Sequence, residues 1–160
     1  MESNSTYLGI LIESLEKKAE VLDQIIAKNE EQKLMLNDDN MDEDDFTDNL
    51  KAKEELIDQL ELLDDGFQEV YNRIKEELVS KKDAYADEIK RMQELISEIT
   101  DKSMTIRAGE ERNRQAAQRK FSLIRGEIHQ AHRSRNAATK YYSSMSRVNY
   151  VDAQFMDKRK

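Results

Sequence analysis

Residues 46–78 read FTDNLKAKEELIDQLELLDDGFQEVYNRIKEEL, and the spacing of the apolar residues in this stretch decides the fold. From Phe46 onward, one stripe of positions recurs at strictly alternating intervals of four and three residues. The stripe consists of Phe46, Leu50, Lys53, Ile57, Leu60, Asp64, Phe67, Tyr71, Ile74 and Leu78. This interval is the repeat of one helix face, so the stretch predicts a long amphipathic helix with a narrow buried stripe.

Two local features test the continuity of this helix. The triplet Asp64-Asp65-Gly66 is typical of a turn, but the stripe keeps its phase on both sides, so we expect the helix to continue. The same phase also continues through Lys81, Tyr85, Glu88, Met92, Leu95 and Ile99. One helix from Phe46 to Ile99 would be roughly 80 Å long at 1.5 Å per residue. The alternative is a break in the polar seam at residues 80–83.

Upstream, a first helix is predicted to begin at Ser5 or Thr6 and to end near Asn37. Its predicted stripe is Leu8, Ile12, Leu15, Ala19, Leu22 and Ile26. Clustered Asn and Asp residues over 37–45 favour a turn, and Asp44 or Asp45 is the predicted N-cap of the next helix.

The loop also resembles the start of a calcium-binding EF-hand, because Asp38, Asn40 and Asp42 have the required spacing. The sixth position is however Glu43 instead of glycine, and the twelfth is Asn49 instead of a bidentate glutamate. We therefore interpret residues 37–45 as a capped connection between helices.

A turn or kink is predicted between Thr100 and Gly109, followed by a third long helix. The stripe of that helix is Ala117, Phe121, Ile124, Ile128, Ala131, Ala138, Tyr142 and Met145. The predicted fold class is all-α, an elongated antiparallel helical hairpin or bundle of three long helices with coiled-coil-like packing. A break near Ser80 would make four. Residues 1–145 form one bundle in this interpretation, and residues 146–160 form a mobile C-terminal tail.

Composition excludes several classes of function. The chain has no Pro and no Cys, which favours unbroken helices and excludes thiolate chemistry. His129 and His132 lack the Glu-x-x-His partners of a di-iron bundle, and no phosphate-binding or catalytic-triad motif is present. We therefore expect no enzyme activity, no metal and no cofactor. Without an apolar segment of about 18 residues or a signal peptide, we expect a cytoplasmic protein with no membrane span.

Charge is distributed unevenly along the chain. Residues 1–100 carry a net charge of −16 and residues 101–160 carry +8. The basic half lacks interleaved aromatic residues for base stacking, so no specific nucleic-acid binding is expected. Attraction between the two halves within a bundle is the simpler interpretation, while a partner-binding surface and weak nucleic-acid contact remain open.

Several local patterns resemble those of the FlgN-like family of flagellar export chaperones, with FliT-like relatives as a neighbouring group. These patterns are KEELIDQLE at 53–61, LDDGFQEVY at 63–71, QELI at 93–96, Ile106, EERN at 110–113, Tyr141-Tyr142 and FMDKRK at 155–160. The resemblance implies a cytoplasmic chaperone without ATPase activity. It also implies that the partners are hook-associated proteins of the hook–filament junction, together with the export machinery.

The resemblance places cargo contact toward the C-terminal helical region. The candidate cargo-binding residues there are Tyr141, Tyr142, Met145, Tyr150, Val151, Phe155 and Met156. Aromatic and Met side chains adapt to varied helical partners, although self-contact would also bury them. The alternative functions are a homo-oligomeric coiled-coil scaffold without a client and a nucleic-acid-associated coiled coil. A homodimer is compatible with either the chaperone or the scaffold.

Overall fold

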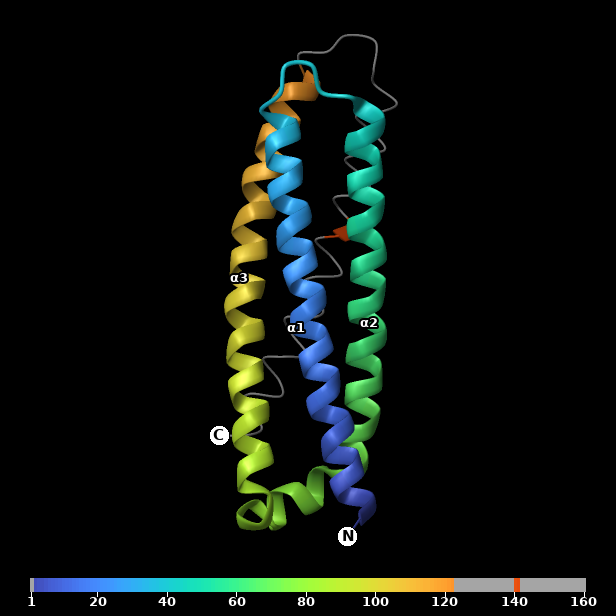
Figure 1. Cartoon of the computed structure of the whole chain (residues 1–160), viewed down its shortest axis with the longest axis vertical. Helices are drawn as coiled ribbons and strands as arrows, with labels where there is room; N and C mark the ends of the chain where they lie inside the picture. Colours follow the sequence, from blue (N-terminus) through green and yellow to red (C-terminus); the bar gives the residue numbers. More distant parts are fainter. Residues whose placement is uncertain (1, 123–139, 142–160) are drawn as a thin grey trace.

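A computed structural model describes residues 2–122 and 140–141, with side chains described from residue 6 onward. The elements are α1 (Glu2–Leu36), α2 (Glu43–Ser80), the short 3-10 helix η1 (Lys82–Tyr85) and α3 (Ala86–Ser122). The three long helices alternate in direction and form an elongated antiparallel bundle (Figure 1). No strand occurs among the described residues, so the predicted all-α bundle of long helices is confirmed. In this part of the chain, no helix is long and apolar enough to cross a membrane.

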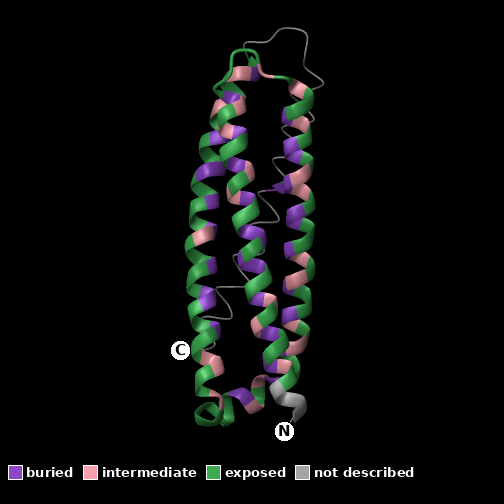
Figure 2. Cartoon of the chain, in the orientation of Figure 1, coloured by how far each residue is buried: buried purple, intermediate pink, exposed green. Residues whose placement is uncertain are grey.

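The first helix, α1, is the central element of the bundle. It packs against both α2 and α3, whereas α2 and α3 do not pack main chain against main chain (Figure 1). The buried residues of all three helices line their inner faces (Figure 2). Because α1 has a neighbour on each side, it needs a wider buried face than a helix with a single partner.

This wider face corrects the predicted stripe of α1. Ile12 and Ile26, which were predicted to lie on the buried stripe, are only half-buried. The buried positions that follow the three–four alternation are Leu8, Leu11, Leu15, Lys18, Leu22, Ile25, Asn29, Gln32 and Leu36. The helix also begins at Glu2, earlier than the predicted start at Ser5 or Thr6.

The connection between α1 and α2 is capped as expected, but by another aspartate. Asp42 is the N-cap of α2, and its side chain accepts a hydrogen bond from the main-chain N–H of Asp44 at 2.8 Å. The predicted caps, Asp44 and Asp45, instead lie with Glu43 in the acidic first turn, where they face the positive end of the helix dipole. Asp38 accepts from the N–H of Asn40 and stabilises the preceding turn.

The prediction of one helix from Phe46 to Ile99 is wrong. The helix ends in the polar seam at residues 80–83, where the alternative prediction had placed a break. Lys81 has φ −119° and ψ 41°, which ends α2, and η1 then leads into α3. The stripe has no buried member between Leu78 and Met92. Folding back allows Met92 and the residues beyond it to bury their side chains against α1, which a continuous helix would prevent.

Two further predictions about continuity have opposite outcomes. The helix does pass through Asp64-Asp65-Gly66, as the unchanged phase indicated. No turn occurs between Thr100 and Gly109, because α3 runs through this segment to Ser122. The reversal of the chain that was predicted there occurs about twenty residues earlier, at Lys81. Most of the predicted third-helix stripe, from Ile124 onward, lies outside the described residues.

Aromatic side chains join α2 and α3 at the end of the bundle near the α1–α2 loop. Phe46 at the start of α2 and Phe121 at the end of α3 meet edge to face, with ring centroids 5.3 Å apart. Leu36 and Leu50 complete this small cluster, which is separate from the main core. Contacts of this kind add to the free energy of apolar burial, so the Phe46–Phe121 pair stabilises this end of the bundle.

Candidate functional site

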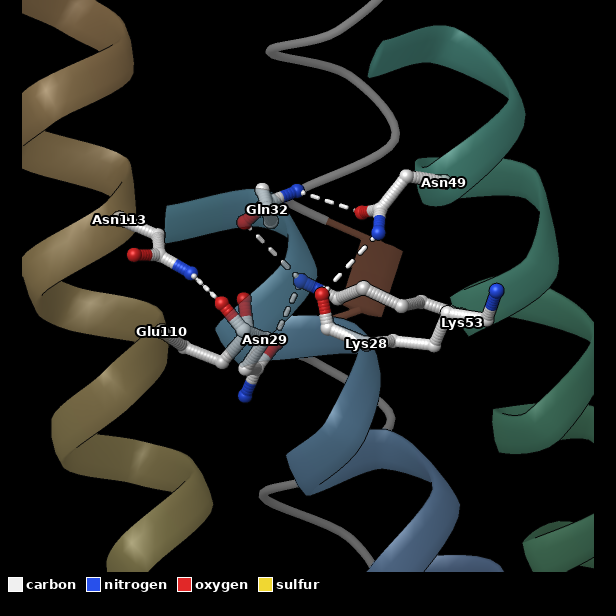
Figure 3. A network of polar contacts seen from close by, with 7 residues as sticks. All are labelled: Lys28, Asn29, Gln32, Asn49, Lys53, Glu110 and Asn113. Atoms are coloured by element: carbon white, nitrogen blue, oxygen red, sulfur yellow. Dashed lines mark hydrogen bonds and ion pairs between the residues drawn. The ribbon is translucent and has the colours of Figure 1, made fainter. Parts of the chain in front are cut away.

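A layer of polar side chains interrupts the core between its main part and the Phe46–Phe121 end (Figure 3). We call it the polar layer, and define it as Asn29, Gln32, Asn49, Lys53, Glu110 and Asn113. All six residues are at most 4% exposed, and every long helix contributes two of them. Buried polar groups are costly unless they are paired, so the partners of each side chain decide what the layer does.

The strongest contact in the layer is an ion pair between α2 and α3. Lys53 Nζ lies 2.6 Å from Glu110 Oε1, and both side chains are almost fully buried. The Lys53 ammonium also donates a hydrogen bond to Gln32 Oε1 at 3.3 Å. Burial lowers the pKa of Lys53 from its usual 10.5, and the nearby Glu110 carboxylate opposes this shift. The ion pair joins the two helices whose main chains do not pack together.

Amide side chains tie the remaining parts of the layer to α1. Gln32 donates to Asn49 Oδ1, and Asn49 donates to the main-chain carbonyl of Lys28, each at 3.0 Å. On the other side of α1, Asn113 donates to the main-chain carbonyl of Asn29 at 2.9 Å. The carbonyls of Lys28 and Asn29 thereby anchor α2 and α3, respectively, to the same turn of α1. The layer therefore sets the axial register of all three helices.

The side chain of Asn29 is the exception to this pairing. It is 3% exposed, and its Nδ2 and Oδ1 have no hydrogen-bond partner among the described residues. It faces Gly109 on α3, where an added Cβ would lie 3.5 Å from Nδ2. An added Cβ at Gly109 would therefore be in ordinary van der Waals contact with Asn29. An unpaired buried amide lowers stability, so Asn29 is a costly residue at this position of the core.

Tyr141, which follows α3 in the chain, lies against the polar layer. Tyr141 is 2% exposed and belongs to the main core, and Lys53 Nζ lies 4.9 Å from its ring centroid. This distance is within the range of a cation–π contact. Lys53 therefore contacts a carboxylate, an amide oxygen and an aromatic ring together.

A second buried ion pair lies farther along the bundle, between α1 and α2. Lys18 Nζ is 2.9 Å from Asp64 Oδ1, with side-chain exposures of 2% and 11%. This pair joins two helices that already pack closely along their length. It resembles the Lys53–Glu110 pair in type and burial.

Of the predicted cargo-binding residues, the structure describes only Tyr141. It places this residue in the core beneath Lys53, which gives it a partner that the sequence did not indicate. The other candidates lie outside the described residues: Tyr142, Met145, Tyr150, Val151, Phe155 and Met156. The predicted tail at residues 146–160 lies outside them as well.

Part of the polar layer could be predicted from the sequence. Lys53 and Asp64 stood on the α2 stripe among apolar residues, and both are buried as that position requires. Their partners, Glu110 and Lys18, were missed. The available clue was a complementary charge at a stripe position of another helix. For Glu110 it required the chain reversal at Lys81, and for Lys18 it required the α1 stripe that the structure shows.

Two other features are minor. A pocket of about 270 Å³ lies at the corner of α2, η1 and α3, lined in part by Tyr71, Leu78, Ile89, Lys82 and Lys90. Within residues 2–122 and 140–141, no group of three or more His, Cys, Asp or Glu side chains is arranged to hold a metal ion. The polar layer is therefore the most distinctive site that the structure describes.

Comparison with known proteins gives the family. A sequence model of the FlgN protein family matches residues 7–147, which include all of α2 and α3 and nearly all of α1. No curated protein and no solved structure matches the chain. A family match over most of the chain, together with the long-helix bundle, shows that this protein belongs to the FlgN family of flagellar export chaperones.

Proposed function

We propose that the protein is a cytoplasmic chaperone that binds hook-associated proteins and prevents their premature assembly. The proposal rests on the family match over residues 7–147. It further proposes that the chaperone keeps the terminal helices of these proteins apart until it delivers them to the flagellar export machinery. Such clients are amphipathic helices, which bind helical partners through apolar residues on one face.

The architecture of the bundle supports this function. Its two outer helices, α2 and α3, are joined by side chains and not by main-chain packing. The core between them also accepts Tyr141, a side chain from outside the three long helices. A bundle that accommodates an added aromatic residue in this way is suited to accommodate residues of a client helix.

The proposed client contacts are the C-terminal candidates Tyr142, Met145, Tyr150, Val151, Phe155 and Met156, together with the buried site that Tyr141 fills beside Lys53. Large aromatic and thioether side chains supply much contact area and adapt to helices of different sequence. The net charge of +8 over residues 101–160 would also attract clients with acidic helices.

The test is complex formation between the purified chain and purified hook-associated proteins from the same organism. We expect a stable, stoichiometric complex in size-exclusion chromatography with light scattering, and delayed polymerisation of the client in its presence. A chain that forms homo-oligomers and binds none of these proteins would instead support a scaffold without a client.

A further inference from the structure

We infer that Lys53 and Glu110 form a binding site for one aromatic ring, and that a client helix inserts an aromatic residue there in competition with Tyr141. The inference rests on the proposed chaperone function and names a chemical feature of the client.

The site is held by the three long helices and not by the ring. Glu110 fixes the Lys53 ammonium at 2.6 Å, and Gln32 accepts a second hydrogen bond from it. Gln32 is itself held by Asn49. Lys53 thus presents its charge to the space that Tyr141 occupies through contacts that do not involve Tyr141. A site organised in advance loses little conformational entropy when another ring enters.

Stability alone does not account for the pair. A buried ion pair must overcome the desolvation of both charges, and apolar residues of similar size usually stabilise a core equally well or better. The neighbouring positions on the α2 stripe, Leu50 and Ile57, are apolar and buried. What the Lys53 ammonium contacts is therefore a better guide to its role than stability is. A desolvated ammonium over an aromatic face favours a ring over an aliphatic side chain.

Tyr141 shows which chemistry the site accepts. Its ring is 2% exposed and lies 4.9 Å from Lys53 Nζ. It follows α3 in the chain and belongs to none of the three helices that hold Lys53, Glu110 and Gln32. A client aromatic residue uses the same contact, and its apparent affinity is reduced by the fraction of molecules in which Tyr141 fills the site.

The test uses full-length variants and titration calorimetry with the C-terminal helical segment of a hook-associated protein. A second version of this segment has its aromatic residues replaced by leucine. We expect Tyr141→Leu to tighten binding of the natural segment by about two- to thirtyfold, which corresponds to about 0.5–2 kcal/mol. Tyr141→Phe keeps the ring and should bind as the wild type does.

The receptor itself is tested with the double variant Lys53→Met/Glu110→Leu, which removes both charges together. We expect this variant to bind the natural and the leucine-substituted segments equally. The matched control is Lys18→Met/Asp64→Leu, which removes the other buried pair and should keep the preference for the aromatic segment. Circular dichroism establishes that each variant is folded.

The outcomes separate the inference from the function on which it rests. If the wild type binds neither segment, the proposed chaperone function fails, and the inference fails with it. If the wild type binds both segments equally, or if Tyr141→Leu and Tyr141→Phe bind the natural segment alike, the client binds but the inference is wrong. Loss of the aromatic preference in the Lys18/Asp64 control would also overturn it.

Discussion

At the scale of single residues, the core of this bundle contains charged side chains at stripe positions that are otherwise mostly apolar. Lys18, Lys53, Asp64 and Glu110 all lie on helix stripes, and all are at most 9% exposed. The sequence predicts burial of Lys53 and Asp64 because the three–four spacing continues through them. It does not predict the pairs, since the partners lie 46 and 57 residues away in the chain and meet only after the helices have folded back.

The Lys53–Glu110 pair leads to a stability prediction. Lys53→Met leaves the Glu110 carboxylate buried without its partner, so we expect the free energy of unfolding at pH 7 to fall by about 3–5 kcal/mol. The double variant Lys53→Met/Glu110→Leu should lie within about 1 kcal/mol of the wild type or above it. Urea denaturation followed by circular dichroism measures both. A single variant as stable as the wild type would show that Glu110 finds water or another donor.

Asn29 leads to the opposite prediction. Because its amide is buried without a hydrogen-bond partner among the described residues, Asn29→Leu removes a desolvation cost of about 1–3 kcal/mol. Leucine has the same branching at Cγ as asparagine, so the substitution keeps the shape of the side chain. We therefore expect a higher free energy of unfolding in urea titrations. Asn113→Leu is the control and should be destabilising, since Asn113 donates to a buried carbonyl. A loss of stability in Asn29→Leu would indicate a bound water molecule.

At the scale of elements, the presence of a long helix was easier to predict than the residues at which it begins and ends. The stripe from Phe46 to Leu78 is confirmed residue by residue, including its passage through Gly66. The reversal at Lys81 was placed too late because it has neither Pro nor Gly, and because the phase happens to continue across it. Its only local sign is a seam without apolar residues over 80–83. The chain reverses at Lys81 because the reversal allows Met92 and Ile99 to be buried against α1. This gain in apolar burial depends on how the helices pack and is not visible in the local sequence.

The start of α2 gives a prediction at this scale. Asp42 accepts from the N–H of Asp44 and carries a charge at the positive end of the helix dipole. We expect Asp42→Ala to reduce the free energy of unfolding by about 0.5–2 kcal/mol, and Asp42→Asn to have a smaller effect. The control Asp39→Ala removes an exposed carboxylate from the same loop and should change little. Equal effects of Asp42→Ala and Asp39→Ala would mean that loop charge, and not the cap, is responsible.

At the scale of the whole molecule, α1 holds together two helices that are otherwise joined only through side chains. Ion pairs such as Lys102–Asp23 and Arg112–Glu30 connect the basic end of α3 with acidic positions of α1. They are largely exposed and contribute little individually to stability. The stability of the bundle therefore depends mainly on its apolar stripes, while the hydrogen bonds of the polar layer fix the relative positions of its helices.

The last prediction concerns the C-terminal end of the chain, which the proposed function uses. If residues 146–160 contact or cover the client site and are not part of the core, their deletion should leave helicity and the thermal midpoint nearly unchanged. The same deletion should change the affinity for the C-terminal segment of a hook-associated protein. Affinity falls if these residues contact the client and rises if they cover its site. Circular dichroism and titration calorimetry on the full chain and the truncated chain measure both quantities.

Tyr141 makes the result of this deletion interpretable. It lies outside the deleted segment and is part of the main core, so the truncated chain keeps the contact with Lys53. A change in affinity then comes from residues 146–160 themselves. Unchanged affinity with an intact fold would remove Tyr150, Val151, Phe155 and Met156 from the client site, whereas unfolding would show that they belong to the core. Only the first result leaves client binding to the site that Tyr141 fills beside Lys53.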